Sequence, residues 1–286
     1  MLRFSDFAAA HGLIVGDLYA SDRIRRCATV EHPRKKNGSY FWDGRRGWVL
    51  AWDGEGEVRW YNDPGAKPWT DAEKRAFAQK RAAERTRLVE RQKQAARRAE
   101  ELVRSAVPGK HGYLDRKGLH ACNGLVLPDE SLIVPMRNLG TNALQGAQVI
   151  RWLPEERVWE KKMLPGTVAK GAVFHIGPPR PSETILCEGY ATGLSIDAAA
   201  RQMRINAAVL VCFSAGNLAH VAPMTKGRKY TFADNDKSGT GERSARDAGL
   251  AYCLSEVVGE DANDLHVRAG LMAVCQKLMA VRRALT

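Results

Sequence analysis

The strongest constraint on the fold is a strand–turn–helix pattern that occurs three times between residues 184 and 257. Apolar runs at 184–187, 207–212 and 229–233 each end in a turn, and a segment of helical character follows each turn. Strands that alternate with helices in this way form parallel βαβ units. The pattern predicts an α/β fold over residues 181–286, with a parallel sheet flanked by helices.

Ligands of such sheets bind outside the carboxyl ends of the strands, so the three strand-end loops form the candidate site. The first loop carries Glu188 in CEGYATG, and the second carries Gly216 and Asn217 in CFSAGNL. The third carries Asp234 and Asp236 in FADNDKSGTG. Each of these loops, taken alone, is also typical of an ordinary polar turn.

The three loops together indicate a metal site. Residues i and i+2 of an extended chain point to the same side, so Asp234 and Asp236 direct two carboxylates at one point. Glu188 adds a third, and three carboxylates at one edge repel each other unless a cation neutralises them. Hard divalent cations take oxygen ligands and share them with phosphates. The cluster predicts Mg²⁺ or Mn²⁺ at these residues, and chemistry at phosphates.

The N-terminal segment, residues 1–70, is aromatic and glycine-rich. Its pairs of Asp43 with Gly44 and of Asp53 with Gly54 predict tight turns between short antiparallel strands. We expect a small β-rich module here.

Residues 71–106 contain no Gly or Pro, and Thr70 and Glu73 are placed for a capping box at the start of a helix. Their large apolar side chains form too thin a stripe for burial, so we expect a solvated basic helix that acts as a linker. Residues 107–180 alternate strand-like runs with Gly, Pro and Asn turns, and they predict a basic, β-rich α+β subdomain.

The charge of the chain is unevenly distributed. The formal net charge is +12, but residues 181–286 hold 12 of the 44 basic and 11 of the 32 acidic residues, so the excess lies in the first 180. Such a basic segment is typical of nucleic-acid binding. The six cysteines are scattered without a CxxC pair, which favours reduced thiols in the cytoplasm. No apolar run approaches the ~20 residues that a membrane span needs.

The motifs LCEGYATGLS, CFSAGNL and FADNDKSGTGERSARDAG resemble the Toprim fold of primases, topoisomerases and some nucleases, and above all the Toprim primases of phages and plasmids. The resemblance implies that Glu188, Asp234 and Asp236 organise catalytic metal. The run DANDLHVRAG resembles the acidic segment after the last Toprim strand. It implies Asp264, or in second place Asp261, as a further carboxylate.

Upstream, HGYLDRKGL and the strands after it resemble the basic subdomain that precedes Toprim in those primases, so the resemblance covers residues 107–264. It implies that this subdomain holds template and nucleoside triphosphates. The residues predicted to bind nucleotide or template are Arg137, Arg151, Lys162, Lys170, Gly216, Asn217 and Lys237.

The sequence departs from that family at two points. Bacterial replicative primases carry an aspartate shortly after the EG glutamate, whereas Thr192 stands at that position here. The N-terminal module occupies the place of a zinc ribbon but offers only Cys27 and His32. Since tetrahedral zinc needs four ligands, we expect no structural zinc.

The N-terminal module intersperses cations with aromatic rings, a combination that single-strand binding uses. The predicted DNA contacts are Arg34, Lys35, Lys36, Arg45, Arg46 and Trp48. The alternative is a small β core with a solvated basic rim.

The function implied by the resemblance is that of a DNA primase, a nucleotidyltransferase that joins ribonucleotides into a short RNA primer on single-stranded DNA during phage- or plasmid-type replication. No GxxxxGK[ST] loop occurs, so we expect a separate replicative helicase as partner. We also expect a cytoplasmic location and no membrane association. A Toprim nuclease and a non-catalytic DNA-binding replication factor are the alternatives. A topoisomerase is disfavoured, because no tyrosine-bearing domain of adequate size remains outside the assigned segments, although Tyr113 and Tyr190 stay open as nucleophiles.

Overall fold

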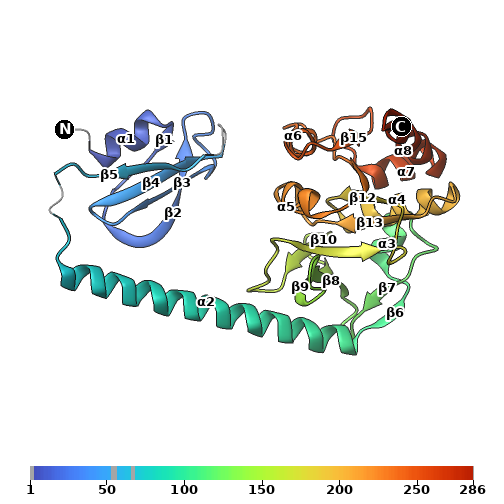
Figure 1. Cartoon of the computed structure of the whole chain (residues 1–286), viewed down its shortest axis with the longest axis horizontal. Helices are drawn as coiled ribbons and strands as arrows, with labels where there is room; N and C mark the ends of the chain where they lie inside the picture. The colour runs from blue at the N-terminus through green and yellow to red at the C-terminus, as the bar shows by residue number, and fades with distance from the viewer. Residues whose placement is uncertain (1–2, 53–56, 66–67, 286) are drawn as a thin grey trace. The chain divides into compact units, whose positions relative to one another are not determined.

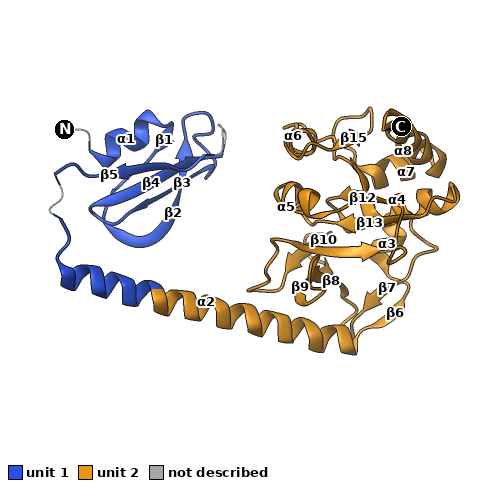
Figure 2. Ribbon diagram, viewed as in Figure 1, with its two compact units in different colours: residues 1–81 blue, residues 82–286 orange. Residues whose placement is uncertain are grey.

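The computed structural model describes residues 3–52, 57–65 and 68–285. The chain forms two compact units, 1–81 and 82–286, which are coloured separately in Figure 2. The division falls within the long helix α2 (Asp71–Ser105) rather than at either of its ends.

The first unit is a small antiparallel β structure with a helix packed on one face (Figure 1). Its elements in the described residues, beside the start of α2, are α1 (Phe4–Ala10), β1 (Leu13–Ile14), β2 (Ser21–Thr29), β3 (Gly38–Trp42), β4 (Arg46–Ala51) and β5 (Arg59–Asn62). The strands pair in chain order. Because alternate residues of a strand point to opposite faces, Tyr40, Val49 and Tyr61 are buried together around Phe4 of α1. This cluster is the core of the unit.

The predicted turn at Asp43 and Gly44 joins β3 to β4. The side chain of Asp43 accepts hydrogen bonds from the N–H groups of Arg45 at 2.8 Å and Arg46 at 2.6 Å. Gly44 has a φ of +94°, a conformation that favours glycine. The second predicted turn, at Asp53 and Gly54, lies outside the described residues.

Helix α2 begins with the predicted capping box. The N–H of Thr70 donates to the Glu73 carboxylate at 2.8 Å, and the N–H of Glu73 donates to the Thr70 hydroxyl at 3.2 Å. Residues 71–91 are exposed, as expected of a linker. The last turns differ from that expectation, because Ala99 is buried against Ile133 and its neighbours in the second unit. A stripe of alanines allows this close packing where large apolar residues are few.

The second unit is a mixed α/β structure built on one continuous sheet (Figure 1). Its strands are β6 (Val107–Gly109), β7 (Gly124–Val126), β8 (Leu132–Asn138), β9 (Leu144–Leu153), β10 (Val158–Met163), β11 (Ala172–Ile176), β12 (Glu183–Cys187), β13 (Ala207–Val211), β14 (Arg228–Phe232) and β15 (Ala251–Cys253). Its further helices are α3 (Gly112–Arg116), α4 (Tyr190–Gln202), α5 (Ala215–Val221), α6 (Thr240–Asp247), α7 (Ala262–Ala269) and α8 (Leu271–Ala284), with a 3-10 turn at Ala222–Met224.

The strands predicted to be parallel are parallel. β13, β12, β14 and β15 lie side by side in that order. β11 then pairs antiparallel with β13 on one side and with β8 on the other, and β9 and β10 follow β8. The sheet is therefore mixed rather than purely parallel, and the segments before and after residue 180 share it.

Helices cover both faces of the parallel part of the sheet. Ile185 and Cys187 of β12 point to the face covered by α4, α7 and α8, whereas Leu186 between them points to the face covered by α5. Burial on both faces explains the continuous apolar runs of these strands. Because β12, β13 and β14 run parallel, their carboxyl ends meet at one edge of the sheet, where ligands of such folds bind.

Two further findings concern both units. The described part of the chain contains no helix long and apolar enough to cross a membrane. All six cysteines are free thiols, and four of them are buried, where they pack as small apolar side chains.

Candidate functional site

Glu188 is the first residue after β12 and lies at the carboxyl edge of the sheet. Its carbonyl oxygen accepts a hydrogen bond from the N–H of Phe213 at 2.9 Å, which ties this strand end to the one after β13. Burial raises the pKa of the Glu188 carboxyl, and the charge of Asp236 adds to the rise, while a hydrogen bond from the N–H of Ala215 opposes it. A positive partner would therefore stabilise the ionised form of Glu188.

Asp234, two residues beyond β14, is the most perturbed carboxyl group of this edge. Burial raises its pKa to about 7, and the charges of neighbouring carboxylates contribute to the rise. In decreasing order of effect, these neighbours are Glu188, Asp261, Asp236 and Asp264. The Oδ1 atom of Asp234 is buried and has no hydrogen-bond partner among the described residues. Buried polar atoms without a partner are uncommon, and this one points to an interaction that the chain does not supply.

Asp236 shapes the turn that follows β14. Its carboxylate accepts hydrogen bonds from the N–H groups of Ser238 at 2.8 Å, Gly241 at 3.0 Å and Thr240 at 3.2 Å, and from the hydroxyl of Ser238. Burial alone would raise the pKa of Asp236, but these hydrogen bonds outweigh burial and hold the pKa below its usual range. Asp236 is therefore an ionised residue that also closes a polar turn.

The loop that carries both aspartates is fixed from two sides. Asn235 donates its N–H to the carbonyl of Glu260 at 3.1 Å, and its side-chain amide donates to the carbonyl of Ser255 at 2.9 Å. On the other side, a Cβ at Gly241 would lie 2.4 Å from the carbonyl oxygen of Asp234. Only glycine permits this approach, so the first turn of α6 supports the backbone of Asp234 directly.

Asp261 and Asp264, the two carboxylates considered as additions to the site, have different partners. Asp261 caps α7 by accepting two backbone hydrogen bonds at 2.7 and 2.9 Å, and its other oxygen accepts the hydroxyl hydrogen of Thr192 at 2.8 Å. Asp264 pairs with Lys117 at 3.0 Å. Because Asp261 raises the pKa of Asp234 more than Asp264 does, Asp261 is the stronger electrostatic neighbour of Asp234.

The surroundings of Asp234 fit a divalent cation. Within residues 3–52, 57–65 and 68–285, no group of three or more His, Cys, Asp or Glu side chains is arranged to hold a metal ion as it stands. A cation would nevertheless satisfy the unpartnered oxygen of Asp234 and neutralise the like charges around it. Oxygen donors are also those that Mg²⁺ prefers. The residues that would hold the ion are Glu188, Asp234 and Asp236.

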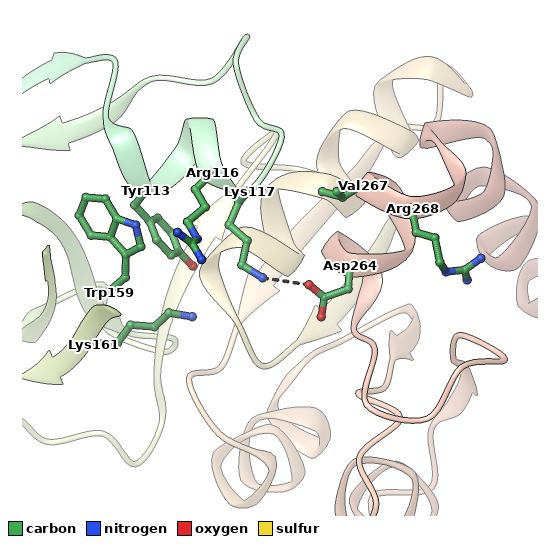
Figure 3. Close-up of a pocket in the computed structure, with 8 residues that line it drawn as sticks. All are labelled: Tyr113, Arg116, Lys117, Trp159, Lys161, Asp264, Val267 and Arg268. Carbon is green, nitrogen blue, oxygen red and sulfur yellow. Dashed lines mark hydrogen bonds and ion pairs between the residues drawn. The ribbon is translucent and has the colours of Figure 1, made fainter. Parts of the chain in front are cut away.

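A pocket of about 360 Å³ lies between α3, β10 and α7, beside this edge of the sheet. It is lined by Tyr113, Arg116, Lys117, Trp159, Lys161, Asp264, Val267 and Arg268. Figure 3 shows the rings of Trp159 and Tyr113 on one side, with Lys161 beside them, and Asp264 on the other, with Lys117 between. Since Asp264 also raises the pKa of Asp234, the pocket is electrostatically connected to the carboxylate edge.

Arg151 and Lys162, two predicted nucleotide or template contacts, lie away from this pocket. The register of β9 and β10 pairs Glu160 with Arg151, and side chains alternate along β10, so that these residues lie on the face opposite Trp159. Both cations pair with Glu160, at 2.7 Å for Arg151. Hydrogen bonds from Lys162 and then from Arg151 lower the pKa of Glu160. The charges of both cations are therefore already partnered.

Four other predicted contacts are at the surface. Lys170 and Lys237 are exposed. Arg137 donates to the carbonyl of Asn142 at 3.1 Å in the turn between β8 and β9. Gly216 is exposed in the first turn of α5, and a Cβ there would meet nothing within 4 Å. These positions remain open to a ligand.

Asn217, one of the predicted nucleotide or template contacts, has a structural role. It is buried, and its side-chain oxygen accepts the N–H of Gly171 at 2.7 Å. Its amide nitrogen donates to the carbonyls of Ala172 at 2.7 Å and Cys212 at 2.8 Å. Asn217 thereby ties β11 to the end of β13, and both hydrogens of its amide are in use.

The predicted DNA contacts of the first unit fall into two groups. The loop between β2 and β3 carries the exposed cations Arg34, Lys35 and Lys36. Arg45 and Arg46 have partners within the unit, since Arg45 pairs with Glu73 at 3.0 Å and Arg46 lies 4.6 Å from the ring centroid of Trp69.

Trp48 lies on the face of the first sheet that α1 does not cover. Its neighbour Val49 points into the core, so Trp48 points outward, in register with Phe41 on β3 and Trp60 on β5. Trp60 is 68% exposed. An aromatic row therefore crosses the outer face of this sheet.

The lining of the pocket in the second unit contains residues that the sequence pattern did not single out. The alternation within VWEKKM places Trp159 and Lys161 on one face of β10 and Glu160 and Lys162 on the other. This alternation could have distinguished Lys161 from Lys162 at the level of the sequence. Tyr113, weighed only as a nucleophile, is buried, and burial raises its pKa to about 12.

Residues 183–271 match the Toprim domain family. The matched segment runs from β12 to the start of α8 and includes Glu188, Asp234 and Asp236. A comparison with curated proteins found no match. Toprim domains bind Mg²⁺ in general and occur in enzymes such as primases and nucleases. The chain therefore contains a domain associated with metal-dependent chemistry on nucleic acids.

Proposed function

We propose that this protein is a DNA primase that joins ribonucleoside triphosphates into a short RNA primer on single-stranded DNA. The observation that supports it most is that a cation-lined pocket, built mainly from the segment before the Toprim domain, lies beside the Toprim carboxylates. That segment resembles the subdomain in which phage and plasmid primases hold template and nucleotide. A nuclease acts on a phosphodiester already in the strand and has no need of such a pocket for a second substrate.

In this proposal, the strand-end carboxylates hold Mg²⁺ or Mn²⁺. When bound there, such an ion would supply a positive charge that lowers the pKa of a 3′-hydroxyl and neutralises pyrophosphate. Asp236 stays ionised because three N–H groups and a hydroxyl hydrogen-bond to its carboxylate. Asn235 and Gly241 hold the loop that carries Asp234 and Asp236 in place.

Surface cations of both units would hold the nucleic acid. Lys170, Lys237 and Arg137 contact template or nucleotide phosphates, and the loop of Arg34, Lys35 and Lys36 contacts the single strand. A separate replicative helicase supplies duplex opening, and the reaction takes place in the cytoplasm of a bacterial host.

A primer-synthesis assay tests the proposal. The full-length protein is incubated with single-stranded DNA, four ribonucleoside triphosphates of which one is labelled, and Mg²⁺ or Mn²⁺. We expect a ladder of short RNA products that disappears in Asp234→Asn. The matched control is Asp247→Asn, an exposed carboxylate on α6, which should retain the ladder.

The same assay distinguishes the alternatives. A nuclease would degrade the template without forming RNA, and Asp234→Asn would abolish that degradation. A non-catalytic DNA-binding factor would form no product and retain its affinity for DNA in Asp234→Asn. Either outcome would overturn the primase proposal.

A further inference from the structure

The end of α3 carries a cation to which the proposed function gives no role. Lys117 caps the carboxyl end of α3, and its ammonium group lies 3.0 Å from Oδ1 of Asp264 on α7 (Figure 3). The Lys117 side chain is 27% exposed, so much of it is shielded from water. Asp264 belongs to the segment that matches the Toprim domain, whereas Lys117 precedes it. The ion pair therefore joins the upstream segment to the Toprim domain.

A second set of contacts holds the backbone of Lys117 against α7. The side-chain amide of Asn263, which is fully buried, donates to the carbonyl of Lys117 at 2.8 Å and to the hydroxyl of Ser195 at 3.0 Å. The chain then turns at Gly118, whose φ is +68°, and a Cβ there would lie 3.1 Å from Val267 of α7. The position of the Lys117 ammonium group is therefore set by the packing of α3 on α7 as well as by the ion pair.

The carboxylate edge holds more negative charge than one divalent ion neutralises. Asp234 and the four carboxylates that raise its pKa are five acidic groups in mutual reach. Within the described residues, Asp264 is the one of these five that has an ion-pair partner. Sites for phosphate chemistry often use two divalent ions. A lysine ammonium group is a compact point charge, so it can stand where one of two such ions would stand.

We propose that Lys117 is the fixed counter-ion of the carboxylate edge and takes the place of a second divalent ion at Asp264. The edge then binds one ion, at Glu188, Asp234 and Asp236. Lys117 is a positioning residue, because it acts through Asp264. The inference rests on the metal-binding part of the proposed function and does not depend on which reaction the site performs.

Counting bound Mn²⁺ ions tests this assignment. The full-length protein is titrated with Mn²⁺ in the absence of nucleotide and DNA, at a salt concentration that screens weak surface binding, and free Mn²⁺ is measured by electron paramagnetic resonance. We expect one ion per chain in the wild type and none in Asp234→Asn. Lys117→Met keeps a long side chain but removes the charge, so it should bind two ions. Lys117→Arg keeps the charge and should bind one.

A double variant locates the additional ion. Lys117→Met combined with Asp264→Asn lacks the carboxylate that the lysine leaves free, and it should bind one ion again. The matched control is Lys226→Met, an exposed lysine before the amino end of β14, which should bind one ion as the wild type does. Thermal unfolding establishes that each variant is folded. Lys117→Gln, a second uncharged variant, should bind two ions and decides the matter if Lys117→Met does not fold.

Several results overturn the proposal. A wild-type protein that binds two ions, or none, contradicts it, and so does a single ion in the folded uncharged variants. Two ions in Lys117→Arg or in Lys226→Met would show that the charge of Lys117 is not what decides the number. Two ions in the double variant would place the additional ion away from Asp264.

Failure of this proposal and failure of the primase function give different results. Primer synthesis by a wild-type protein that binds two ions overturns the role of Lys117 alone. Conversely, one ion in the wild type and two in Lys117→Met, without any primer synthesis, support the role of Lys117 and overturn the primase function.

Discussion

The hydroxyl of Thr192 donates a 2.8 Å hydrogen bond to Oδ2 of Asp261. Thr192 lies in the first turn of α4, and Asp261 caps α7, so the bond joins two helices on the same face of the sheet. Thr192 lies within the segment that matches the Toprim domain family. The bond places the carboxylate of Asp261 beside the first turn of α4.

This bond predicts a stability effect. Thr192→Val keeps the shape of the side chain but removes the hydroxyl that donates the hydrogen bond. A part-buried oxygen of Asp261 then lacks this partner. We expect a loss of about 1–3 kcal/mol in the free energy of unfolding, measured by urea denaturation. Thr192→Ser keeps the hydroxyl and should lose less. Equal losses in the two variants would contradict the importance of the bond.

The raised pKa of Asp234 predicts that stability falls as pH rises. The pKa is raised from 3.8 to about 7 in the folded protein, so the folded state binds a proton that the unfolded state has released at intermediate pH. The free energy of unfolding of the metal-free protein should therefore decline between about pH 4 and pH 7 and level off above pH 7.

The contribution of Asp234 to this decline is about 2–4 kcal/mol, since nearby carboxylates titrate together with it. Asp234→Asn removes the group and should be more stable than the wild type at pH 8, by denaturation in the presence of a chelator. Asp247→Asn, at the exposed end of α6, should keep the wild-type decline. A wild-type profile that is flat from pH 4 to pH 8 would refute the prediction.

Magnesium should reverse part of this loss. An ion that binds the folded state at a hundred times its dissociation constant stabilises that state by about 2.7 kcal/mol. We expect Mg²⁺ at pH 8 to raise the midpoint of thermal unfolding of the wild type and a chelator to lower it again. In Asp234→Asn the midpoint should not respond to Mg²⁺. The same response in variant and wild type would place the bound ion elsewhere.

Gly241 should tolerate no side chain. The added Cβ of Gly241→Ala would meet the carbonyl oxygen of Asp234 at 2.4 Å, so either α6 or the aspartate loop must move. We expect a loss of about 2 kcal/mol in unfolding free energy by urea denaturation, together with a weaker response to Mg²⁺. Gly216→Ala, where the methyl group meets nothing within 4 Å, should leave the unfolding free energy equal or higher. A stable Gly241→Ala protein would show that the loop adapts.

The exposed loop of the first unit should contribute to single-strand binding through charge. Replacing Arg34, Lys35 and Lys36 together by alanine removes up to three phosphate contacts. The slope of log affinity against log salt should become shallower by about 2, because each contact on a single strand contributes about 0.7. Fluorescence anisotropy with labelled oligothymidylate at several salt concentrations measures this slope. An unchanged slope would leave the loop as a solvated rim.

Much of the local structure was predictable from the sequence because it depends on neighbouring residues. The Thr70–Glu73 capping box, the turn at Asp43 and Gly44, and the parallel order of β12, β13 and β14 follow from turn chemistry, capping and apolar periodicity. The position of Glu188 and Asp234 just beyond their strands follows from the same patterns.

The sequence pattern did not distinguish residues of the same type that lie on opposite faces of one strand. Lys161 and Lys162 are adjacent, yet Lys161 lines the pocket and Lys162 pairs with Glu160 on the other face. Charge counts treat them alike. Asn217 likewise looked available for a ligand, whereas strand ends distant in sequence use its amide.

By itself, the sequence determined the βαβ order, the strand-end carboxylates, the long helix and the basic character of the first 180 residues. Only the tertiary structure decided that β11 joins the two halves of the second unit in one sheet, that Asp261 rather than Asp264 acts more strongly on Asp234, and that a pocket lies beside them. The reason is physical. Turns, caps and periodicity are set by bonds between near neighbours, whereas burial, like-charge proximity and cavities depend on which distant segments pack together.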